Sequence, residues 1–277
     1  MTTWPAGAQA AVTFSFDDGY ALTYENTALP LHQRGMCATY NLITDNVGGV
    51  FEGLPVATWQ QWGEAVRLGH EIASHSATHA PMAGTLSAVR RALAGFGAAP
   101  DSLVYARQLV ATASALRKWS KHLALHAPLS SPTLSDLVNS RLTIERHLPG
   151  VKAESFVFPA GLHQAYSRRL VGQAGFTSAR ASNMGLNDPS CDFFALRAIT
   201  LGPGLEIEDL YPWLDRACHR RAWLIIALHW VAKSNSMGYP YFCSLDGFQR
   251  LLDAVQARTF WVATQGQVIR HWNQHKE

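Results

Sequence analysis

Two adjacent carboxylates, Asp17 and Asp18, stand directly after the apolar run Ala11 to Phe16 and before Gly19. In parallel α/β sheets and barrels, functional side chains gather at the carboxyl ends of strands, where the loops begin. Two neighbouring acids at such an end repel each other. A divalent cation bound by one, with the other left as a base, is therefore an economical arrangement. A plain Asp-Asp-Gly turn is the structural alternative.

A pair of histidines four residues apart follows a second predicted strand. Residues 75–79 read His-Ser-Ala-Thr-His and come after the short run Glu71 to Ser74. On one helical turn, His75 and His79 would share a face and could bind the same ion. Imidazoles suit zinc and its neighbours among the transition metals, and a carboxylate completes a facial set of three ligands. Three protein ligands with one open position are typical of a catalytic metal site.

A third polar residue at a strand end is His229, which follows the apolar run Leu224 to Leu228. A lone histidine after such a run is ordinarily structural. Its place at another predicted carboxyl end favours a functional role, because an imidazole can donate a proton to a leaving group.

The elements that must position these residues alternate between apolar runs and helical patterns. Strands are predicted at residues 11–16, 38–43, 71–74, 155–158, 176–181, 224–228 and 260–264. Helices are predicted at residues 24–34, 58–68, 167–173 and 248–257. This order predicts an α/β fold, a parallel sheet or barrel with helices outside.

Residues 85–131 break the alternation, because this segment has a helical pattern throughout and is rich in Ala, Leu, Arg and Lys. Leu109, Leu116 and Leu123 recur there at helical spacing among basic residues. We expect a helical insertion within a single domain that spans residues 1–277. Packing over the barrel, a lid or wall beside the site, and an oligomer contact are the open alternatives for its role.

The composition describes a globular protein with a large core. Hydrophobic residues make up 48% of the 277 residues and charged residues 16%, which excludes a disordered chain. The formal net charge is only +3 and no run of Lys or Arg occurs, so nucleic acid is not expected as a partner. The four cysteines are scattered without a paired spacing and are expected in the core.

Four motifs give the chain a resemblance to a known family. They are Ser-Phe-Asp-Asp-Gly, His-Ser-Ala-Thr-His, Phe-Val-Phe-Pro-Ala-Gly and Ala-Leu-His, in that order. The chain resembles the polysaccharide deacetylases, the NodB-homology group or carbohydrate esterase family 4, over about residues 10–83 and 133–272. The resemblance implies a distorted (β/α) barrel. It also implies removal of acetyl groups from N-acetylated sugars or, in some members, of O-acetyl groups from xylan.

The resemblance also implies a role for each residue of the motifs. Asp17 matches the general base, and Asp18, His75 and His79 match the metal ligands. His229 matches the acid that protonates the leaving amine. The metal, most simply zinc with cobalt, nickel or manganese as alternatives, would lower the pKa of its bound water. Asp17 would take that proton as the water attacks the amide carbon.

The third motif departs from the family pattern at two positions. Val157 stands where many members have an Arg that pairs with the base, and Ala160 where they have a Tyr whose backbone N–H serves the oxyanion. A backbone donor does not depend on the side chain, so Ala160 can still serve. Losing the Arg matters more, because it would hold and depress the pKa of the base. Arg180 or Arg197 could supply the missing charge, with a solvated surface role as the alternative.

The surroundings of the proposed acid also differ. Ala227 replaces a Leu that lines the acetyl pocket in relatives, and strand alternation puts it on the same face as His229, which predicts a roomier acyl pocket. Asp192 is a candidate for the carboxylate that usually tunes the acid. Tyr20 and Trp230 are the aromatic residues expected to stack on a sugar.

The sequence therefore predicts a metal-dependent hydrolase that deacetylates an N-acetylated oligo- or polysaccharide. A hydrolase of a small cyclic amide or another non-peptide C–N bond on the same fold is the second hypothesis, and a carbohydrate-binding pseudoenzyme is the third. No apolar stretch of about 18 residues predicts a transmembrane segment. The first residues do not read as a signal peptide. The family makes an extracytoplasmic location an expectation if a leader precedes this sequence.

Overall fold

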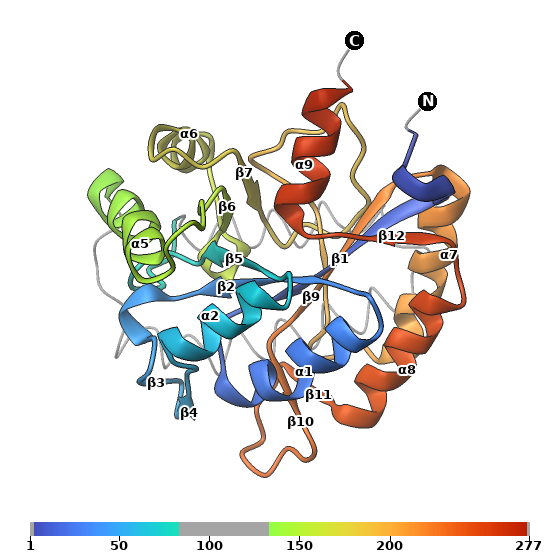
Figure 1. Cartoon of the computed structure of the whole chain (residues 1–277), viewed down its shortest axis with the longest axis horizontal. Helices are drawn as coiled ribbons and strands as arrows, with labels where there is room; N and C mark the ends of the chain where they lie inside the picture. The colour runs from blue at the N-terminus through green and yellow to red at the C-terminus, as the bar shows by residue number, and fades with distance from the viewer. Residues whose placement is uncertain (1–2, 83–132, 276–277) are drawn as a thin grey trace.

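The computed structural model describes residues 3–82 and 133–275 of the chain (Figure 1). An eight-stranded sheet forms its centre, built from β1 (Ala10–Phe16), β2 (Ala38–Leu42), β5 (Glu71–Ser74), β6 (Ser155–Val157), β7 (Ser178–Arg180), β8 (Ile199–Thr200), β9 (Trp223–Leu228) and β12 (Phe260–Val262). The strand order is β7-β6-β5-β2-β1-β9-β8, and β12 pairs with β1 in addition. All of these pairings are parallel.

Helices connect the strands and cover the curled sheet. They are α1 (Ala21–Gln33), α2 (Trp59–Arg67), α5 (Leu134–His147), α6 (Ala165–Gln173), α7 (Tyr211–Arg220), α8 (Leu245–Gln256) and α9 (Gln265–Gln274). Two small strand pairs lie outside the main sheet: β3 (Val50–Phe51) with β4 (Leu54–Pro55), and β10 (Trp230–Ala232) with β11 (Phe242–Ser244). Short 3-10 turns are η1 (Pro5–Gly7), η2 (Thr44–Asn46), η4 (Pro159–Gly161) and η5 (Ile207–Leu210).

The side chains of β1 alternate between two apolar layers, as expected for a strand buried on both faces. One set packs in the larger cluster with α1, α2, α7 and α8, and consists of Ala10, Val12, Phe14 and Phe16. The other set faces the inside of the curl, where Ala11 packs with Trp223. Small side chains suit this narrow interior, and Thr13 there accepts a hydrogen bond from Trp223 Nε1 at 2.9 Å.

Local signals explain where the helices begin. The Thr58 hydroxyl accepts from the backbone N–H of Gln61, and the Gln61 side chain accepts from the backbone of Thr58, so a capping box starts α2. The Ser244 hydroxyl caps α8 in the same manner by accepting from Gly247 N–H. The buried residues of α8 then follow helical spacing: Phe248, Leu251, Leu252 and Val255.

The strand register brings the carboxyl ends of six strands to one edge of the sheet. Phe16, the last residue of β1, pairs with Leu228, the last residue of β9. At the other side of β2, Leu42 pairs with Ser74 at the end of β5. The ends of β6 and β7 lie side by side as well, because Val157 pairs with Arg180. The polar residues that follow these strands are therefore neighbours.

The predicted fold class, a distorted (β/α) barrel, is confirmed by this curled parallel sheet with its helices. Helices α5, α7 and α9 had no prediction from the sequence. The predicted helical insertion at residues 85–131 lies outside the described residues, and the assignment of residues 1–277 to one domain stays a prediction. None of the helices in the described part of the chain has the length and hydrophobicity that crossing a bilayer requires.

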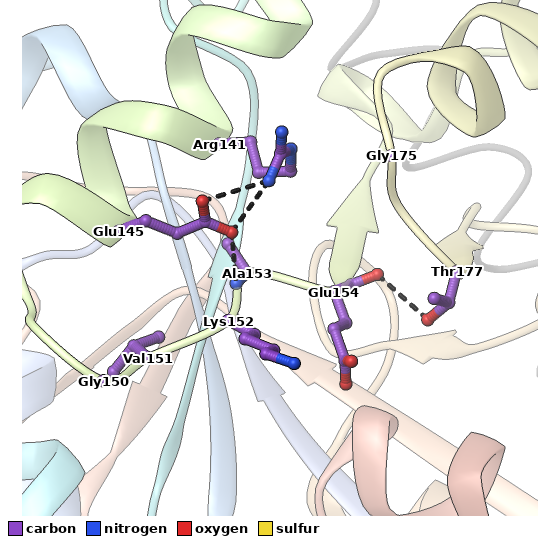
Figure 2. Close-up of a pocket in the computed structure, with 9 residues that line it drawn as sticks. All are labelled: Arg141, Glu145, Gly150, Val151, Lys152, Ala153, Glu154, Gly175 and Thr177. Carbon is purple, nitrogen blue, oxygen red and sulfur yellow. Dashed lines mark hydrogen bonds and ion pairs between the residues drawn. The ribbon is translucent and has the colours of Figure 1, made fainter.

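A surface pocket of about 480 Å³ lies at the opposite, amino-terminal edge of β6 and β7 (Figure 2). Its lining is Arg141, Glu145, Gly150, Val151, Lys152, Ala153, Glu154, Gly175 and Thr177. Arg141 Nη1 donates to both carboxylate oxygens of Glu145, at 2.9 and 3.0 Å, so the charges of these two residues neutralise each other. The convergent acids and histidines lie at the other edge.

Candidate active site

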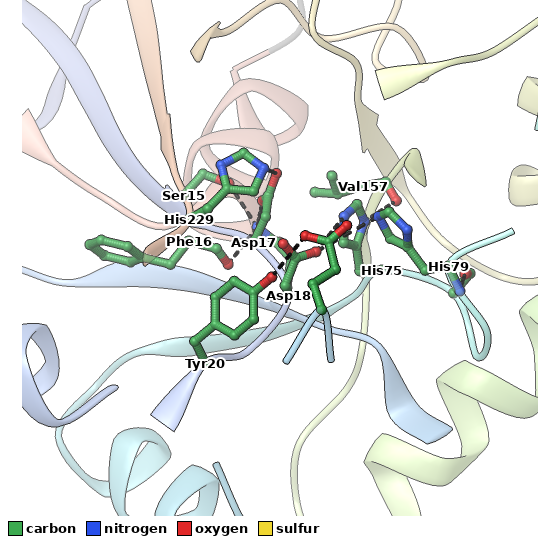
Figure 3. Close-up of polar contacts among 12 residues, drawn as sticks. Ser15, Phe16, Asp17, Asp18, Tyr20, His75, His79, Val157 and His229 are labelled. Atoms are coloured by element: carbon green, nitrogen blue, oxygen red, sulfur yellow. Dashed lines mark hydrogen bonds and ion pairs between the residues drawn. The ribbon is translucent and has the colours of Figure 1, made fainter. Parts of the chain in front are cut away.

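Asp18, His75 and His79 converge at the carboxyl ends of β1 and β5 (Figure 3). The Oδ1 atom of Asp18 lies 3.5 Å from His75 Nε2 and 3.7 Å from His79 Nε2. One potential ligand atom from each residue lies within 4.8 Å of the other two. Asp18 and His75 are buried, and His79 keeps partial exposure. The three side chains thus point their lone pairs at one small volume.

The two histidines meet through a loop, so the predicted helical turn is wrong. Residues 75–80 have irregular backbone, in which φ is 67° at Ser76 and 59° at His79. The Ser76 hydroxyl accepts a hydrogen bond from the backbone N–H of His79 at 2.9 Å, which closes the turn. The two imidazole centroids are 4.7 Å apart as a result. The spacing of four was right for the site, but the geometry behind it is that of a tight loop.

Left-handed backbone is concentrated around this edge of the sheet. Seven non-glycine residues in the described ranges have positive φ, and four of them lie here: Asp18 at 70°, Ser76 at 67°, His79 at 59° and Ala160 at 53°. Such conformations are uncommon for residues with a Cβ atom and persist where the surroundings enforce them. Strained backbone beside convergent acids and imidazoles is typical of a functional site.

The three side chains fit a divalent cation. Asp18 Oδ1 is buried and has no hydrogen-bond partner among the described residues. His75 Nδ1 lies 2.9 Å from the carbonyl oxygen of Val157, and a carbonyl can only accept, so Nδ1 carries the proton and Nε2 offers its lone pair. Burial lowers the pKa of both His75 and His79, which keeps them in the neutral form that binds metals.

The electrostatics of Asp18 point the same way. Burial, and then the charges of Asp17 and Glu52, raise the pKa of Asp18 well above its ordinary value. A cation held between Asp18 and the histidines would offset this penalty. A hydrogen bond from Tyr20 acts in the opposite direction by favouring the carboxylate. The Tyr20 hydroxyl also lies 3.0 Å from that of Tyr239 and 3.5 Å from Glu52 Oε2.

Asp17, the neighbouring acid, is held as a carboxylate by Arg180 and Asn41. Arg180 Nη2 donates to Oδ1 at 2.6 Å and to Oδ2 at 2.5 Å, and Asn41 Nδ2 donates to Oδ1 at 2.8 Å. Burial acts to raise the pKa of Asp17. The charges of Arg180, His229 and His75 outweigh that effect and lower the pKa to about 2. Asp17 is thus ionised and fixed in orientation.

Of the two arginines expected to supply the missing charge, the structure brings Arg180 to Asp17. Arg180 ends β7 and is fully buried. Arg197 is exposed; its backbone exchanges hydrogen bonds with the Asn187 side chain, and its side chain lies over Gly185. The hypothesis that Arg197 compensates Asp17 is therefore wrong. It precedes β8, on a segment that directs its side chain to solvent.

His229 completes the cluster from the end of β9. Its Nε2 lies 3.7 Å from Asp17 Oδ2, while Nδ1 is buried and has no hydrogen-bond partner in the described ranges. Burial, opposed by the charge of Asp17, lowers the pKa of His229 to about 4. Asp192, the candidate partner, instead forms an ion pair with Arg168 at the exposed face of α6, so that assignment is wrong.

Ala160 lies in η4, the turn that follows β6 at the same edge of the sheet. Gly161 N–H donates to the Phe158 carbonyl at 2.7 Å, which closes this turn. A Cβ atom at Gly161 would come within 2.1 Å of Ser182 Oγ, and φ there is 62°, so only glycine fits. The turn is thereby pressed against the segment after β7. The oxyanion role of the Ala160 N–H stays a prediction.

Tyr20 and Trp230 are not placed to stack on a sugar. Tyr20 is 0% exposed and Trp230 is 4% exposed, within an apolar cluster that also contains Leu54. The side chain of Tyr20 serves Asp18 instead. Ala227 is fully buried in the inner cluster of the curl, so it does not line an open acyl pocket, and the prediction of a roomier one is wrong.

Sequence reasoning missed three residues of the site: Asn41, Glu52 and Tyr241. Asn41 is a buried amide near the carboxyl end of β2, and an Asn in a predicted strand was a usable signal. Glu52 comes from the β3–β4 hairpin, and an exposed acid in a turn gives no sequence signal for a functional site. The ring of Tyr241 has its centroid 4.6 Å from that of His229, and nothing in its sequence neighbourhood indicates this contact.

Comparison with known proteins assigns this chain to a family. The sequence profile of the family described as polysaccharide deacetylase matches residues 6–179, more than half of the chain. The chain belongs to the polysaccharide deacetylase family. No protein with a curated description matches it.

Solved structures share the deacetylase fold at low sequence identity. A protein from Mycobacterium smegmatis assigned as a polysaccharide deacetylase is 14% identical, with a TM-score of 0.60 over 99% of this chain and 93% of that one. A deacetylase with substrate is also 14% identical, with a TM-score of 0.52 over 100% of this chain and 96% of that one. The chain covers only 45% of a polysaccharide deacetylase from Bacillus cereus, at 16% identity over 67% of this chain with a TM-score of 0.43. Family membership therefore makes it a carbohydrate deacetylase in general terms.

Proposed function

We propose that this protein is a metal-dependent hydrolase that removes the acetyl group from N-acetylated sugar units of an oligo- or polysaccharide. One observation carries the proposal. Asp17 is an acid fixed by an arginine. The next residue, Asp18, is an acid whose Oδ1 has no hydrogen-bond partner among the described residues and faces two neutral imidazoles. Two consecutive acids thus have different roles: Asp17 is the base and Asp18 is a metal ligand.

The ligand set is Asp18, His75 and His79, with zinc as the simplest occupant and cobalt, nickel or manganese as alternatives. When bound, such a cation supplies Lewis-acid chemistry, polarising the acetyl carbonyl and making water a stronger acid. Val157 orients His75 through its carbonyl, and Tyr20 donates to Asp18. These contacts support a site that is organised before the ion arrives.

Proton transfer is assigned to Asp17 and His229. Asp17 accepts the proton of the attacking water, and His229 Nε2 lies 3.7 Å away to receive it. The pKa of Asp17 is about 2 and that of His229 about 4, and an amine binds protons more tightly than either. From Asp17 the proton thus passes to a stronger base, His229, and then to the amine as the C–N bond breaks. The backbone N–H of Ala160 is the proposed oxyanion donor.

Acetate release tests this function. Protein loaded with zinc, cobalt, nickel or manganese is compared with chelated protein on N-acetylglucosamine oligomers, together with Asp17→Asn and a control, Asp215→Asn. Asp215 is an exposed aspartate with its own arginine partner. We expect metal-dependent release that Asp17→Asn lowers by at least about a hundredfold and Asp215→Asn leaves intact.

Two other outcomes would replace the proposal. Acetate release absent with every metal, together with hydrolysis of a small cyclic amide, would support the second hypothesis. Sugar binding without any turnover would support a pseudoenzyme.

A further inference from the structure

Among the described residues, no carboxylate holds Nδ1 of the His229 imidazole. In the part of the chain that the structure describes, Nδ1 is buried and finds no hydrogen-bond partner. A hydrogen bond at Nδ1 is the usual means of fixing both the ring plane and the proton position of a working histidine. Something else must therefore hold the ring toward Asp17.

An aromatic ring lies against this imidazole. The ring centroids of His229 and Tyr241 are 4.6 Å apart, with an angle of 32° between their planes. This separation is at the short end of the range for offset-stacked aromatic pairs. The contact restricts rotation of the imidazole, because turning the ring on edge would drive it into the tyrosine.

The position of Tyr241 is fixed in turn by Gly202, in the segment after β8. A Cβ atom at residue 202 would come within 2.5 Å of Tyr241 Cδ1 and 2.7 Å of Cε1. The tyrosine ring therefore lies directly against the backbone of Gly202. Any residue with a Cβ atom at position 202 would overlap the ring. The carbonyl of Tyr241 also accepts a hydrogen bond from Trp230 N–H at 3.3 Å.

The backbone of His229 is anchored separately by α1. Thr23 Oγ1 donates to the His229 carbonyl at 2.8 Å and accepts from Val231 N–H at 3.0 Å. Thr23 thus fixes where the histidine leaves the sheet, but it does not fix the plane of its ring. The remaining freedom of the imidazole is the part that Tyr241 restricts.

We propose that Tyr241 is a positioning residue for His229. The tyrosine ring packs against the imidazole and holds Nε2 where it passes its proton to the departing amine. The inference rests on the proposed function, because it assigns His229 the delivery of that proton. This ring contact takes over the orienting role that a carboxylate at Nδ1 would otherwise have. The contact with His229 is made by the tyrosine ring, so phenylalanine should replace tyrosine there.

Two substrates with different leaving groups test the proposal. An N-acetylglucosamine oligomer releases an amine, which must be protonated to leave. 4-Nitrophenyl acetate releases a stable anion that needs no proton. Both are assayed with metal-loaded wild type, Tyr241→Ala, Tyr241→Phe and Gly202→Ala, and with Tyr166→Ala as an exposed aromatic control, 62% exposed on α6. Only the chelator-sensitive part of ester hydrolysis is counted.

We expect Tyr241→Ala and Gly202→Ala to lower kcat on the amide by about ten- to a hundredfold with KM unchanged, while ester hydrolysis stays within about twofold. Tyr241→Phe and Tyr166→Ala should match wild type on both substrates. Retained ester hydrolysis also shows that the variants are folded with an intact site.

Three results would overturn the inference. Equal losses on both substrates would show that Tyr241 supports the site as a whole and not proton delivery. Full amide activity in Tyr241→Ala would show that the ring is dispensable, with the proposed function still standing. If wild type hydrolyses the ester and no N-acetylated sugar, the proposed function fails, and the role of His229 fails with it.

Discussion

Arg180 donates through one nitrogen, Nη2, to both carboxylate oxygens of Asp17, at 2.6 and 2.5 Å. Both side chains are buried, so neither charge has water as an alternative partner. The contact links the carboxyl ends of β7 and β1, which are separated by three strands in the sheet order. Arg180, on a different strand, thus supplies to Asp17 the positive charge that Val157 of the third motif cannot supply.

Removing the Arg180 guanidinium should lower the stability of the folded protein, in addition to its effect on the Asp17 carboxylate. Arg180→Met leaves the Asp17 carboxylate buried and without its main partner, so we expect the free energy of unfolding to fall by about 3 kcal/mol or more. Urea denaturation of the chelated protein at neutral pH measures this loss. Arg197→Met, at an exposed arginine, should stay within about 0.5 kcal/mol of wild type. Similar losses in both variants would contradict the importance of the buried pair.

Tyr20 should control how tightly the metal is held. Its ring is fully buried and its hydroxyl donates to Asp18, so Tyr20→Phe removes a hydrogen bond that supports the ligand carboxylate. We expect zinc affinity to fall by about tenfold, the lower end for losing an outer contact of a metal ligand. Competition with a chromophoric chelator gives the dissociation constant without reference to activity. Tyr166→Phe is the matched control on the surface, and an unchanged affinity in Tyr20→Phe would exclude this role.

The positions of the functional residues along the chain could be predicted because strand ends are readable from composition. Asp17 and His229 follow apolar runs and His75 follows the short strand Glu71–Ser74, and parallel pairing brings the ends of such strands to one edge. The positions of strand ends do not distinguish Arg180 from Arg197 as the partner of Asp17. That choice depends on which side chain turns into the curl, and a short strand such as β7 gives too few residues to read its alternation.

The aromatic contacts escaped prediction for a different reason. Tyr20 follows the Asp-Asp-Gly turn and looked accessible, but the β3–β4 hairpin and the loop before β11 cover it, and it packs there with Leu54 and Tyr239. Tyr241 is 12 residues after His229, on a loop whose path the sequence does not specify. Both contacts are made between segments with no periodic pattern, so they follow from packing and not from local propensity.

Acid should weaken the chelated protein through His229. The imidazole has a pKa of about 4 in the folded protein and an ordinary value of 6.5, so below pH 6.5 the unfolded chain takes up a proton that the folded protein refuses. Stability therefore falls as the pH drops from 6.5 to 4, by about 3 kcal/mol for this group. Unfolding curves in urea across that pH range should show a shallower decline in His229→Gln than in wild type. His219→Gln, at an exposed histidine, should retain the full decline, and equal slopes in all three proteins would contradict the assignment.

The turn that carries Ala160 should depend on the absence of a side chain at Gly161. In Gly161→Ala the new Cβ would lie 2.1 Å from Ser182 Oγ and 2.7 Å from the backbone nitrogen of Ser182, at a φ of 62°. We expect a loss of about 1–3 kcal/mol in the free energy of unfolding, because the turn must move or strain. Acetate release should fall further than stability alone explains, since the displaced turn carries the proposed oxyanion donor. Adding Ser182→Gly removes the contact with the side chain but not the one with the backbone, so the double variant should recover part of both losses. A double variant no better than Gly161→Ala would show that backbone conformation alone, and not the contact with Ser182, requires glycine at this position.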